Sequence, residues 1–263
     1  MQRVVVITGA NSGIGLSTAK ELIKRGDIVY CLSRHKPEDA HIRYVYCDVT
    51  NRQTIETALS TIYNTEKHID VVVNNAGMGI SGATEYEPLE DIQKIININL
   101  IGVINVCSLA LKYLRQTKGR IINIGSLASV FPIPFQSLYS ATKAAVLSFS
   151  LSLHNEVKPT GVKVSCVLPG DTKTNFTANR EKTEVKDDPV YKDRVNNSIS
   201  RMEKDEQNGM SPQKVADVVC KCIYKKRPPL VVSVGLKNKF LRGLLRIFPT
   251  RTMESILYSL YSK

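Results

Sequence analysis

The stretch VVVITGANSGIG, residues 4–15, decides the fold of this chain. Its first five residues are β-branched and predict a buried strand. Three glycines follow in the pattern Gly-x-x-x-Gly-x-Gly, at Gly9, Gly13 and Gly15, and a helical pattern begins at once. Glycines allow a tight turn and let another group approach the backbone closely. A strand, a glycine turn and a helix in direct succession predict the first unit of a doubly wound α/β fold.

The rest of the chain alternates short β-branched runs with longer helical patterns, which favours a parallel sheet covered on both faces. We expect strands at residues 4–8, 28–33, 43–47, 69–73, 120–124, 162–168 and 230–234. We expect helices near residues 13–25, 51–64, 88–114, 138–157 and 211–225. The sequence therefore predicts a Rossmann fold with a seven-stranded parallel sheet, whose ligand crevice lies beyond the carboxyl ends of the strands.

One domain is expected over residues 1–263, with two additions to the sheet and its helices. Residues 171–210 are polar and weakly periodic, which predicts either a substrate lid or a partly disordered surface insertion. Residues 236–263 form a C-terminal extension with basic residues (Lys237, Lys239, Arg242, Arg246) between apolar ones at helical spacing. Those apolar residues are Leu236, Phe240, Leu241, Leu244, Leu245, Phe248, Met253, Ile256, Leu257, Leu260 and Tyr261. Such amphipathic helices lie at an anionic bilayer surface or pack on the body or a subunit interface.

Composition narrows the function classes. The chain has 43% hydrophobic and 23% charged residues, typical of a globular protein, and no apolar run approaches about 18 residues. A net charge of +12 fits an anionic cofactor, a membrane surface or nucleic acid, but aromatic residues are only 6% and no basic run interleaves with them. We therefore expect no nucleic-acid partner. Six scattered cysteines in apolar segments and no signal-peptide pattern indicate a cytoplasmic protein, and nothing indicates a metal site.

The glycine turn predicts a dinucleotide site. A pyrophosphate would lie on the helix N-terminus, where free N–H groups favour anions. The end of the second predicted strand separates the two nicotinamide cofactors, since an acidic residue there binds a ribose hydroxyl and a basic one a phosphate. Here Ser33-Arg34-His35-Lys36 carries no carboxylate before Glu38. Arg34 can contact a phosphate with two hydrogen bonds, so we expect NADP(H) to be preferred over NAD(H).

Tyr139 and Lys143 lie one helical turn apart, and Ser126 lies thirteen residues before Tyr139. Residues at this spacing share a helix face, so the Lys143 ammonium can lie beside the phenol. A nearby cation lowers the pKa of a phenol from about 10. We therefore expect Tyr139 to exchange a proton with an alcohol or carbonyl oxygen near neutral pH.

These motifs together resemble the short-chain dehydrogenase/reductase family over roughly residues 3–235. The resemblance implies that Tyr139 is the general acid/base, that Ser126 holds the substrate oxygen, and that Lys143 binds the nicotinamide ribose. It implies that Asn99 holds a water molecule that links Lys143 to solvent. The cofactor would be bound by Gly9, Asn11, Ser12, Gly13, Ile14, Gly15, Ser33, Arg34, Asp48, Val49, Asn75, Ala76, Gly77, Tyr139, Lys143, Pro169, Gly170 and Thr172. Family members usually form homodimers or homotetramers through the helices predicted near 88–114 and 138–157.

The predicted function is an NADP(H)-dependent oxidoreductase that interconverts a carbonyl and an alcohol. Expected substrate walls are residues 78–80, 127–135 and the 171–210 segment, and the apolar run at 131–135 favours a steroid-, retinoid- or acyl-lipid-like substrate. The tail is longer than in family members that reduce carrier-bound 3-oxoacyl groups. Two alternatives stay open: a non-catalytic NADP(H)-binding redox sensor, and a membrane-surface lipid-binding protein whose functional element is the tail.

Overall fold

The computed structural model describes residues 2–244 and 248–262. The expectations for Leu245 and Arg246, and the two terminal residues of the predicted domain, lie outside the described residues. The predicted seven-stranded parallel sheet is confirmed, with the strand order β3-β2-β1-β4-β6-β7-β9. Its strands are β1 (Val4–Thr8), β2 (Ile28–Ser33), β3 (Arg43–Tyr46), β4 (Val71–Asn74), β6 (Arg120–Ile124), β7 (Lys163–Leu168) and β9 (Val231–Ser233).

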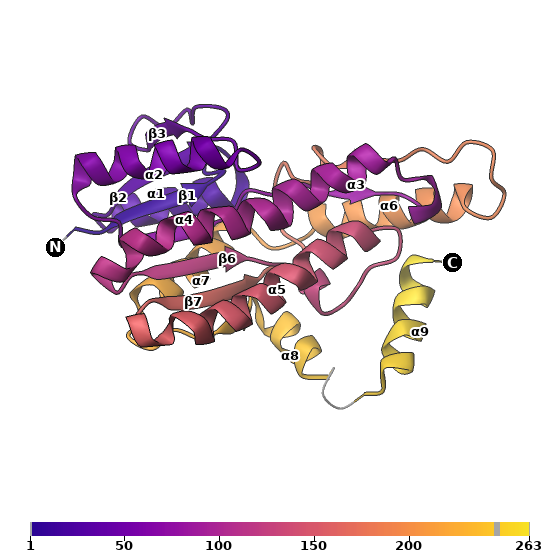
Figure 1. The fold of residues 1–263 in the computed structure, drawn as a ribbon. Helices are drawn as coiled ribbons and strands as arrows, with labels where there is room; N and C mark the ends of the chain where they lie inside the picture. Colours follow the sequence, from indigo (N-terminus) through magenta and orange to yellow (C-terminus); the bar gives the residue numbers. More distant parts are fainter. Residues whose placement is uncertain (1, 245–247, 263) are drawn as a thin grey trace.

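Successive residues of each strand face opposite sides of the sheet. Because most residues in both sets are apolar, both faces of the sheet are apolar. Val4 and Val6 pack into one core with α2 (Arg52–Glu66), α4 (Gly102–Thr117) and α5 (Ser137–Val157). Val5 and Ile7 pack into a second core with α1 (Gly13–Lys24) and α7 (Pro212–Tyr224). Figure 1 shows these two helical layers on either side of the sheet. All six cysteines are buried and unpaired.

The helix predicted near 88–114 contains an irregular turn. It consists of α3 (Leu89–Ile96), a π-helical turn η2 (Asn97–Ile101) and α4. Among the described residues, this one helix, Leu89–Thr117, is long and apolar enough to cross a membrane by length and composition alone. Core helices pass the same test, and α4 contributes Val106, Cys107 and Ala110 to the core beside α2.

Residues 171–210 contain structure that the sequence pattern did not predict. A short strand β8 (Glu181–Lys182) pairs with β5 (Ile80–Ser81) in a separate two-stranded sheet. The helix α6 (Lys192–Gln207) follows and buries Val195, Ile199 and Met202. Side chains three and four residues apart lie on one face of a helix. That spacing is present in the sequence but is diluted by the polar residues around it, which is why we did not predict the helix.

The C-terminal extension forms the two expected helices, α8 (Leu236–Leu244) and α9 (Thr250–Tyr261). They lie at an angle to each other (Figure 1). The helix α9 packs against α6, buries Met253 and Leu257, and its Tyr261 hydroxyl donates to Asp205 at 3.1 Å. Packing on the body is therefore found for α9, while several apolar side chains of both helices stay exposed.

The remaining segments are short 3-10 turns and the loops that join the strands to the helices. The turns are η1 (Thr84–Tyr86), η3 (Leu127–Ser129) and η4 (Lys158–Thr160). The turn η3 comes directly after β6, at the edge of the sheet where the strands end. This edge carries the residues of the candidate site.

Candidate functional site

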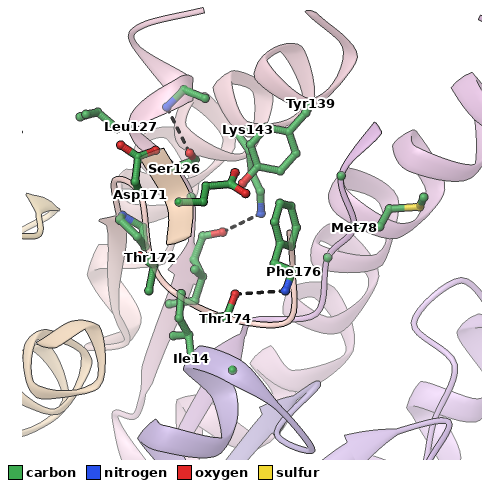
Figure 2. A pocket seen from close by; sticks show the side chains of 18 of the residues that line it. Ile14, Met78, Ser126, Leu127, Tyr139, Lys143, Asp171, Thr172, Thr174 and Phe176 are labelled. Carbon is green, nitrogen blue, oxygen red and sulfur yellow. Dashed lines mark hydrogen bonds between the residues drawn. The ribbon is translucent and has the colours of Figure 1, made fainter. Parts of the chain in front are cut away.

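A cavity of about 1740 Å³ opens at the carboxyl ends of β1, β4, β6 and β7. Of the catalytic and cofactor-binding residues predicted from the sequence, all but Gly15 and Asn99 line it. Its far walls come from α6, α8 and α9. One continuous space therefore runs from the glycine turn past Tyr139 to the C-terminal helices, and Figure 2 shows part of it.

The glycine turn has the conformation that glycine favours. Gly9 has φ +68° and Gly13 has φ +54°, which L-residues with side chains rarely adopt. A Cβ on Gly15 would lie 2.4 Å from the Gly9 carbonyl oxygen, so Gly15 is a packing residue behind the cavity wall. The N-cap Ser12 forms no capping bond, and the first turn of α1 carries no acidic residue. The N–H groups at this helix start suit an anionic group.

Asn75 joins this turn to the end of β4. Its side-chain amide donates to the carbonyl oxygens of Thr8 and Gly9 at 3.1 and 2.9 Å. The backbone N–H groups of Asn75 and Ala76 both donate to the Thr8 hydroxyl at 3.0 Å. Asn75 thus lines the cavity as predicted and also fixes the shape of the glycine turn.

The end of β2 presents positive charge to the cavity. Arg34 and His35 line it, and among the described residues Arg34 forms no ion pair. The Ser33 hydroxyl donates to the His35 carbonyl oxygen at 2.5 Å and fixes this turn. Asp48, on the neighbouring strand end, accepts from the N–H and hydroxyl of Thr50. An anion bound at the end of β2 could therefore form hydrogen bonds with the Arg34 guanidinium.

Tyr139, Ser126 and Lys143 meet in the middle of the cavity (Figure 2). Ser126 caps the turn η3, and its oxygen accepts from the Ala128 N–H at 3.1 Å, which leaves its own proton free to donate. Lys143 Nζ donates to the Ile124 carbonyl oxygen at 3.0 Å and lies 5.7 Å from the centre of the Tyr139 ring. The predicted convergence of these three side chains is confirmed in space.

The pKa of Tyr139 differs from the expectation. Burial raises the pKa of the phenol to about 12, against the opposing effect of the Ser126 hydroxyl. Burial also lowers the pKa of Lys143 to about 8, which weakens the cation that was expected to lower the Tyr139 pKa. The expectation of a phenol pKa lowered by Lys143 is therefore wrong for this structure. A phenol with this pKa is protonated at neutral pH and is a proton donor.

Asn99 lies behind the cavity wall. It is fully buried in the π-helical turn, accepts from the Met78 N–H at 2.8 Å, and donates to the Met78 carbonyl oxygen and the Thr142 hydroxyl at 2.9 and 3.2 Å. A Cβ on Gly77 would lie 3.2 Å from the Asn99 Oδ1 and 3.5 Å from the Lys143 Nζ. Asn99 thus shapes the wall at Met78 close to Lys143. Turns of π-helix often occur at functional sites.

Sequence reasoning missed the residues that cover Tyr139. The Phe176 ring centre lies 5.6 Å from that of Tyr139, and the Arg180 guanidinium lies 5.8 Å from the Phe176 ring centre. The Arg180 side chain is fully buried and pairs with Glu206 of α6, which also accepts from the Thr177 hydroxyl at 2.5 Å. Asp171, Asp205 and Glu206 line the same end of the cavity. These residues belong to no sequence motif that would have predicted their place in the site.

The apolar walls agree in part with the expectation. Met78, Leu127, Ala128, Phe131 and Ile133 line the cavity, but Ile80 and Phe135 do not. The helices α8 and α9 add an apolar wall of Leu236, Leu241, Met253, Ile256, Leu257 and Leu260. Among the described residues, no group of three His, Cys, Asp or Glu side chains could hold a metal ion.

The sequence profile of the short chain dehydrogenase family matches residues 3–185. The chain belongs to this family. A short-chain dehydrogenase is an oxidoreductase with a nicotinamide-dinucleotide cofactor, and the glycine turn and cavity fit such a cofactor. The predicted family, the Rossmann fold and the oxidoreductase class are confirmed.

Three comparisons illustrate the likeness of this short-chain dehydrogenase to known proteins. A 3-ketodihydrosphingosine reductase of Bacteroides thetaiotaomicron is 41% identical over 236 residues, 89% of this chain and 88% of that protein. The probable short-chain type dehydrogenase/reductase VdlC of Helicobacter pylori is 30% identical over 96% of both chains. The structure of a short-chain dehydrogenase from Streptomyces avermitilis matches with a TM-score of 0.83, at 26% identity, over 98% of this chain and 96% of that one.

Proposed function

We propose that this short-chain dehydrogenase is an NADP(H)-dependent reductase that converts a ketone on a long-chain, lipid-like substrate into an alcohol. Tyr139 is the general acid/base of the proposed reaction. The observation that carries the proposal is the single cavity that joins Arg34, the Tyr139 phenol and the apolar side chains of α8 and α9. A relative with 41% identity is named for reducing 3-ketodihydrosphingosine, a long-chain lipid ketone, which supports this substrate class.

The proposed cofactor position follows the shape of the cavity. The N–H groups from Asn11 to Ile14 would bind the pyrophosphate, and Arg34 would bind the ribose phosphate that distinguishes NADP(H). Asp48 and Val49 would flank the adenine, and Asn75, Ala76 and Gly77 the adenosine ribose. Lys143 would bind the nicotinamide ribose, and Pro169, Gly170 and Thr172 would contact the nicotinamide. All of these residues line the cavity.

The proposed reduction adds a hydride to the carbonyl carbon and a proton to its oxygen. The nicotinamide supplies the hydride when it is bound. The Ser126 hydroxyl, whose proton is free because its oxygen accepts from Ala128, donates to the carbonyl oxygen and stabilises the developing charge. Tyr139, which a pKa of about 12 keeps protonated at neutral pH, then gives its proton to that oxygen. The Lys143 amine, 5.7 Å from the ring centre, lies where it can stabilise the phenolate that is left.

A substrate panel tests this proposal. NADPH oxidation by the full-length protein is measured with ketones of increasing chain length, with steroid and retinoid carbonyls, and with short aldehydes. We expect kcat/KM to rise with chain length, because each buried methylene contributes about 0.8 kcal/mol. Tight NADPH binding without turnover of any carbonyl would contradict the proposal and would favour the redox-sensor alternative.

The C-terminal helices support contact with a membrane surface. Leu236 and Phe240 of α8 are 85% and 68% exposed, and Ile256 and Leu260 of α9 are also exposed while lining the cavity. Lys237, Lys239, Arg242 and Arg251 accompany them, against the single acidic residue Glu254 in the described part of the two helices. Apolar side chains with basic neighbours bind anionic bilayers. We propose that this protein is cytoplasmic, docks on an anionic bilayer through α8 and α9, and takes its lipid substrate from that bilayer.

Vesicle flotation tests the docking. Because α9 packs on α6, a truncation could unfold the protein, and point variants are the better probe. We expect the double variant Phe240→Ser, Ile256→Ser to lose flotation with anionic vesicles, and the wild type to float less with neutral ones. An exposed residue far from these helices, Tyr46, provides the control Tyr46→Ser. Equal flotation of wild type and double variant would contradict the docking.

We also propose that residues 171–210 act as the lid and residues 236–263 as the extension of one domain, since described residues of each segment line the cavity. The exposed apolar side chains Leu89, Ile96, Ile101 and Leu151 on α3, η2 and α5 support a homodimer or homotetramer formed through these helices. Light scattering of the full-length protein measures the assembly, and a monomer at micromolar concentration would contradict it.

A further inference from the structure

Asn238, on the first turn of α8, lies against the backbone at Gly170. It is 8% exposed and lines the cavity. A Cβ on Gly170 would lie 2.4 Å from Asn238 Nδ2 and 3.2 Å from its Oδ1, and the three atoms nearest to that Cβ all belong to this amide. The backbone of Gly170 lies outside the left-handed region that favours glycine. The contact with Asn238 is therefore what excludes a side chain at position 170.

The end of the sheet fixes where Asn238 lies. The Val234 N–H donates to the Leu168 carbonyl oxygen at 3.0 Å, which extends the pairing of β9 with β7. The chain then turns at Gly235, with φ +87°, and enters α8. The Asn238 side-chain amide donates back to the Val234 carbonyl oxygen at 2.8 Å. The amide therefore cannot swing away from Gly170 without the loss of this hydrogen bond.

Asn238 supports the segment of chain that is proposed to contact the nicotinamide, which consists of Pro169, Gly170 and Thr172. The Pro169 carbonyl oxygen accepts from the Leu127 N–H at 2.7 Å, at the start of η3. The Gly170 carbonyl oxygen accepts from the Thr172 hydroxyl at 2.8 Å. One side of this segment is thus tied to the turn that carries the serine of the site, and the Asn238 amide lies against the segment at Gly170.

The helix α8 presents a second face to solvent. Leu236 and Phe240 are both exposed and lie one helical turn apart, so they share a face. Asn238 is two residues from each of them, about 200° around the helix axis. One short helix therefore has Gly170 against one face and exposed apolar side chains on the other. A displacement of α8 would reach the proposed nicotinamide segment through the Asn238 amide.

We propose that Asn238 is a positioning residue through which α8 sets how tightly the nicotinamide end of NADP(H) is bound. It acts by holding the Gly170 backbone in place, because a binding segment that is already ordered loses less entropy when its ligand binds. The inference rests on the proposed cofactor site and gives the C-terminal extension a part in cofactor binding. The adenosine end of the cofactor is bound independently of Asn238.

Two ligands that differ in the nicotinamide test this inference. They are NADPH and ADP-ribose 2′-phosphate, which keeps the adenosine and the phosphates but carries no nicotinamide. Calorimetry of the full-length protein measures both dissociation constants. We expect Asn238→Ala to raise the Kd for NADPH about tenfold and to leave that for ADP-ribose 2′-phosphate within about twofold. Gln116→Ala is the matched control, because it removes the same kind of bond, from a side-chain amide to the Lys112 carbonyl oxygen, outside the cavity wall.

A second-site variant tests the contact itself. Gly170→Ala would place a Cβ 2.4 Å from Asn238 Nδ2, so we expect it to displace the amide and to raise the Kd for NADPH at least about tenfold. Asn238→Ala removes the three atoms nearest to that Cβ. The double variant is therefore expected to bind NADPH at least as tightly as Gly170→Ala alone. Losses that add in the double variant would overturn the role of Asn238, because they would show that the two residues act separately.

This inference and the proposed function fail on different results. If Asn238→Ala weakens NADPH binding alone and the wild type turns over no carbonyl, the reductase proposal fails and the role of Asn238 stands. If Asn238→Ala weakens both ligands equally, or neither, the role of Asn238 is refuted, while turnover of the ketone panel still supports the reductase. Unchanged binding of ADP-ribose 2′-phosphate also shows that the variant is folded. A variant that is only unstable has a lower Tm and loses both ligands together, which is the result that refutes the positioning role.

Discussion

The part of the molecule up to residue 170 and the part after it are built in different ways. In the first part, candidate site residues sit at strand ends and are held by short contacts to the backbone, as Asn75 holds the glycine turn. In the second part, the cover over Tyr139 is held by side-chain pairs such as Arg180–Glu206, Lys94–Glu181 and Lys182–Glu203. The Arg180–Glu206 pair is buried, whereas the other two lie at the surface, where an ion pair contributes little. The difference suggests a fixed chemical centre under a cover that is free to vary with substrate.

The largest effect is expected from a substitution in the chemical centre that leaves the cover over Tyr139 in place. Tyr139→Phe removes the proton donor and keeps the ring that packs on Phe176. We expect kcat to fall by roughly a thousandfold, because positioned acid/base groups contribute about 10²- to 10⁴-fold. NADPH binding, measured by fluorescence titration, is expected to stay within about twofold of wild type. A Tyr139→Phe protein that keeps its activity would remove Tyr139 from the chemistry.

The second largest effect is expected in the pH dependence of the reaction, which also tests the role of Tyr139. Reduction needs the protonated phenol, which is present at every pH below its pKa of about 12, so Tyr139 does not limit reduction at neutral pH. Alcohol oxidation needs the phenolate, whose fraction rises tenfold with each pH unit below that value. We expect oxidation to rise about a hundredfold between about pH 7 and pH 9. A plateau near neutral pH would mean that the bound cofactor lowers the Tyr139 pKa.

The sequence predicted the first part of the molecule well, for a physical reason. Strands buried on both faces must be continuous apolar runs, and turns such as the one at Gly9 and Gly13 need left-handed backbone. Both requirements leave a signature in the residues themselves. The strand ends then bring Ser126 near Tyr139 by topology alone. The pKa of Tyr139 was mispredicted because burial, which no motif reports, raises it and also lowers the pKa of Lys143.

The second part was predicted less well. The helix α6 and the Phe176 cover depend on contacts between distant segments, such as Arg180 with Glu206, and these have no fixed spacing. Amphipathic patterns did predict α8 and α9, but not that α9 would line the cavity.

The preference between NADPH and NADH tests Arg34, a cavity-lining residue in the first part of the molecule. Arg34→Asp replaces a free guanidinium in the cavity wall by a carboxylate, which repels a ribose phosphate and accepts from a ribose hydroxyl. We expect the ratio of kcat/KM for NADPH to that for NADH to fall about 10- to 100-fold, the range of a hydrogen bond to a charged group. Lys36→Asp, close by but outside the cavity wall, is the matched control. An unchanged ratio would remove Arg34 from the cofactor site.

A smaller effect is expected when the cover loses apolar surface. Leu257 of α9 is buried and lines the cavity. Leu257→Ser is expected to lower kcat/KM about tenfold for a long-chain ketone, from the lost apolar contact, and to leave a short ketone unchanged. Kinetics with both ketones measure the difference. An equal loss for short and long ketones would indicate that α9 supports the fold of the site rather than the binding of the chain.

The smallest expected effect joins the two parts. Glu206, on the last turn of α6, raises the pKa of Tyr139 across the cavity, and it is tied to the chain by Thr177 and Arg180. Glu206→Gln removes the charge but keeps an acceptor for both partners. The Tyr139 pKa is then expected to fall, so that the oxidation profile moves to lower pH by less than about one unit. Glu203→Gln is the control, because Glu203 pairs with Lys182 and does not line the cavity. A shift with Glu206→Gln alone would mean that the cover sets the acidity of the proton donor as well as the shape of the substrate site. Equal profiles for the two variants would confine the cover to binding and leave the chemistry entirely to the first part of the chain.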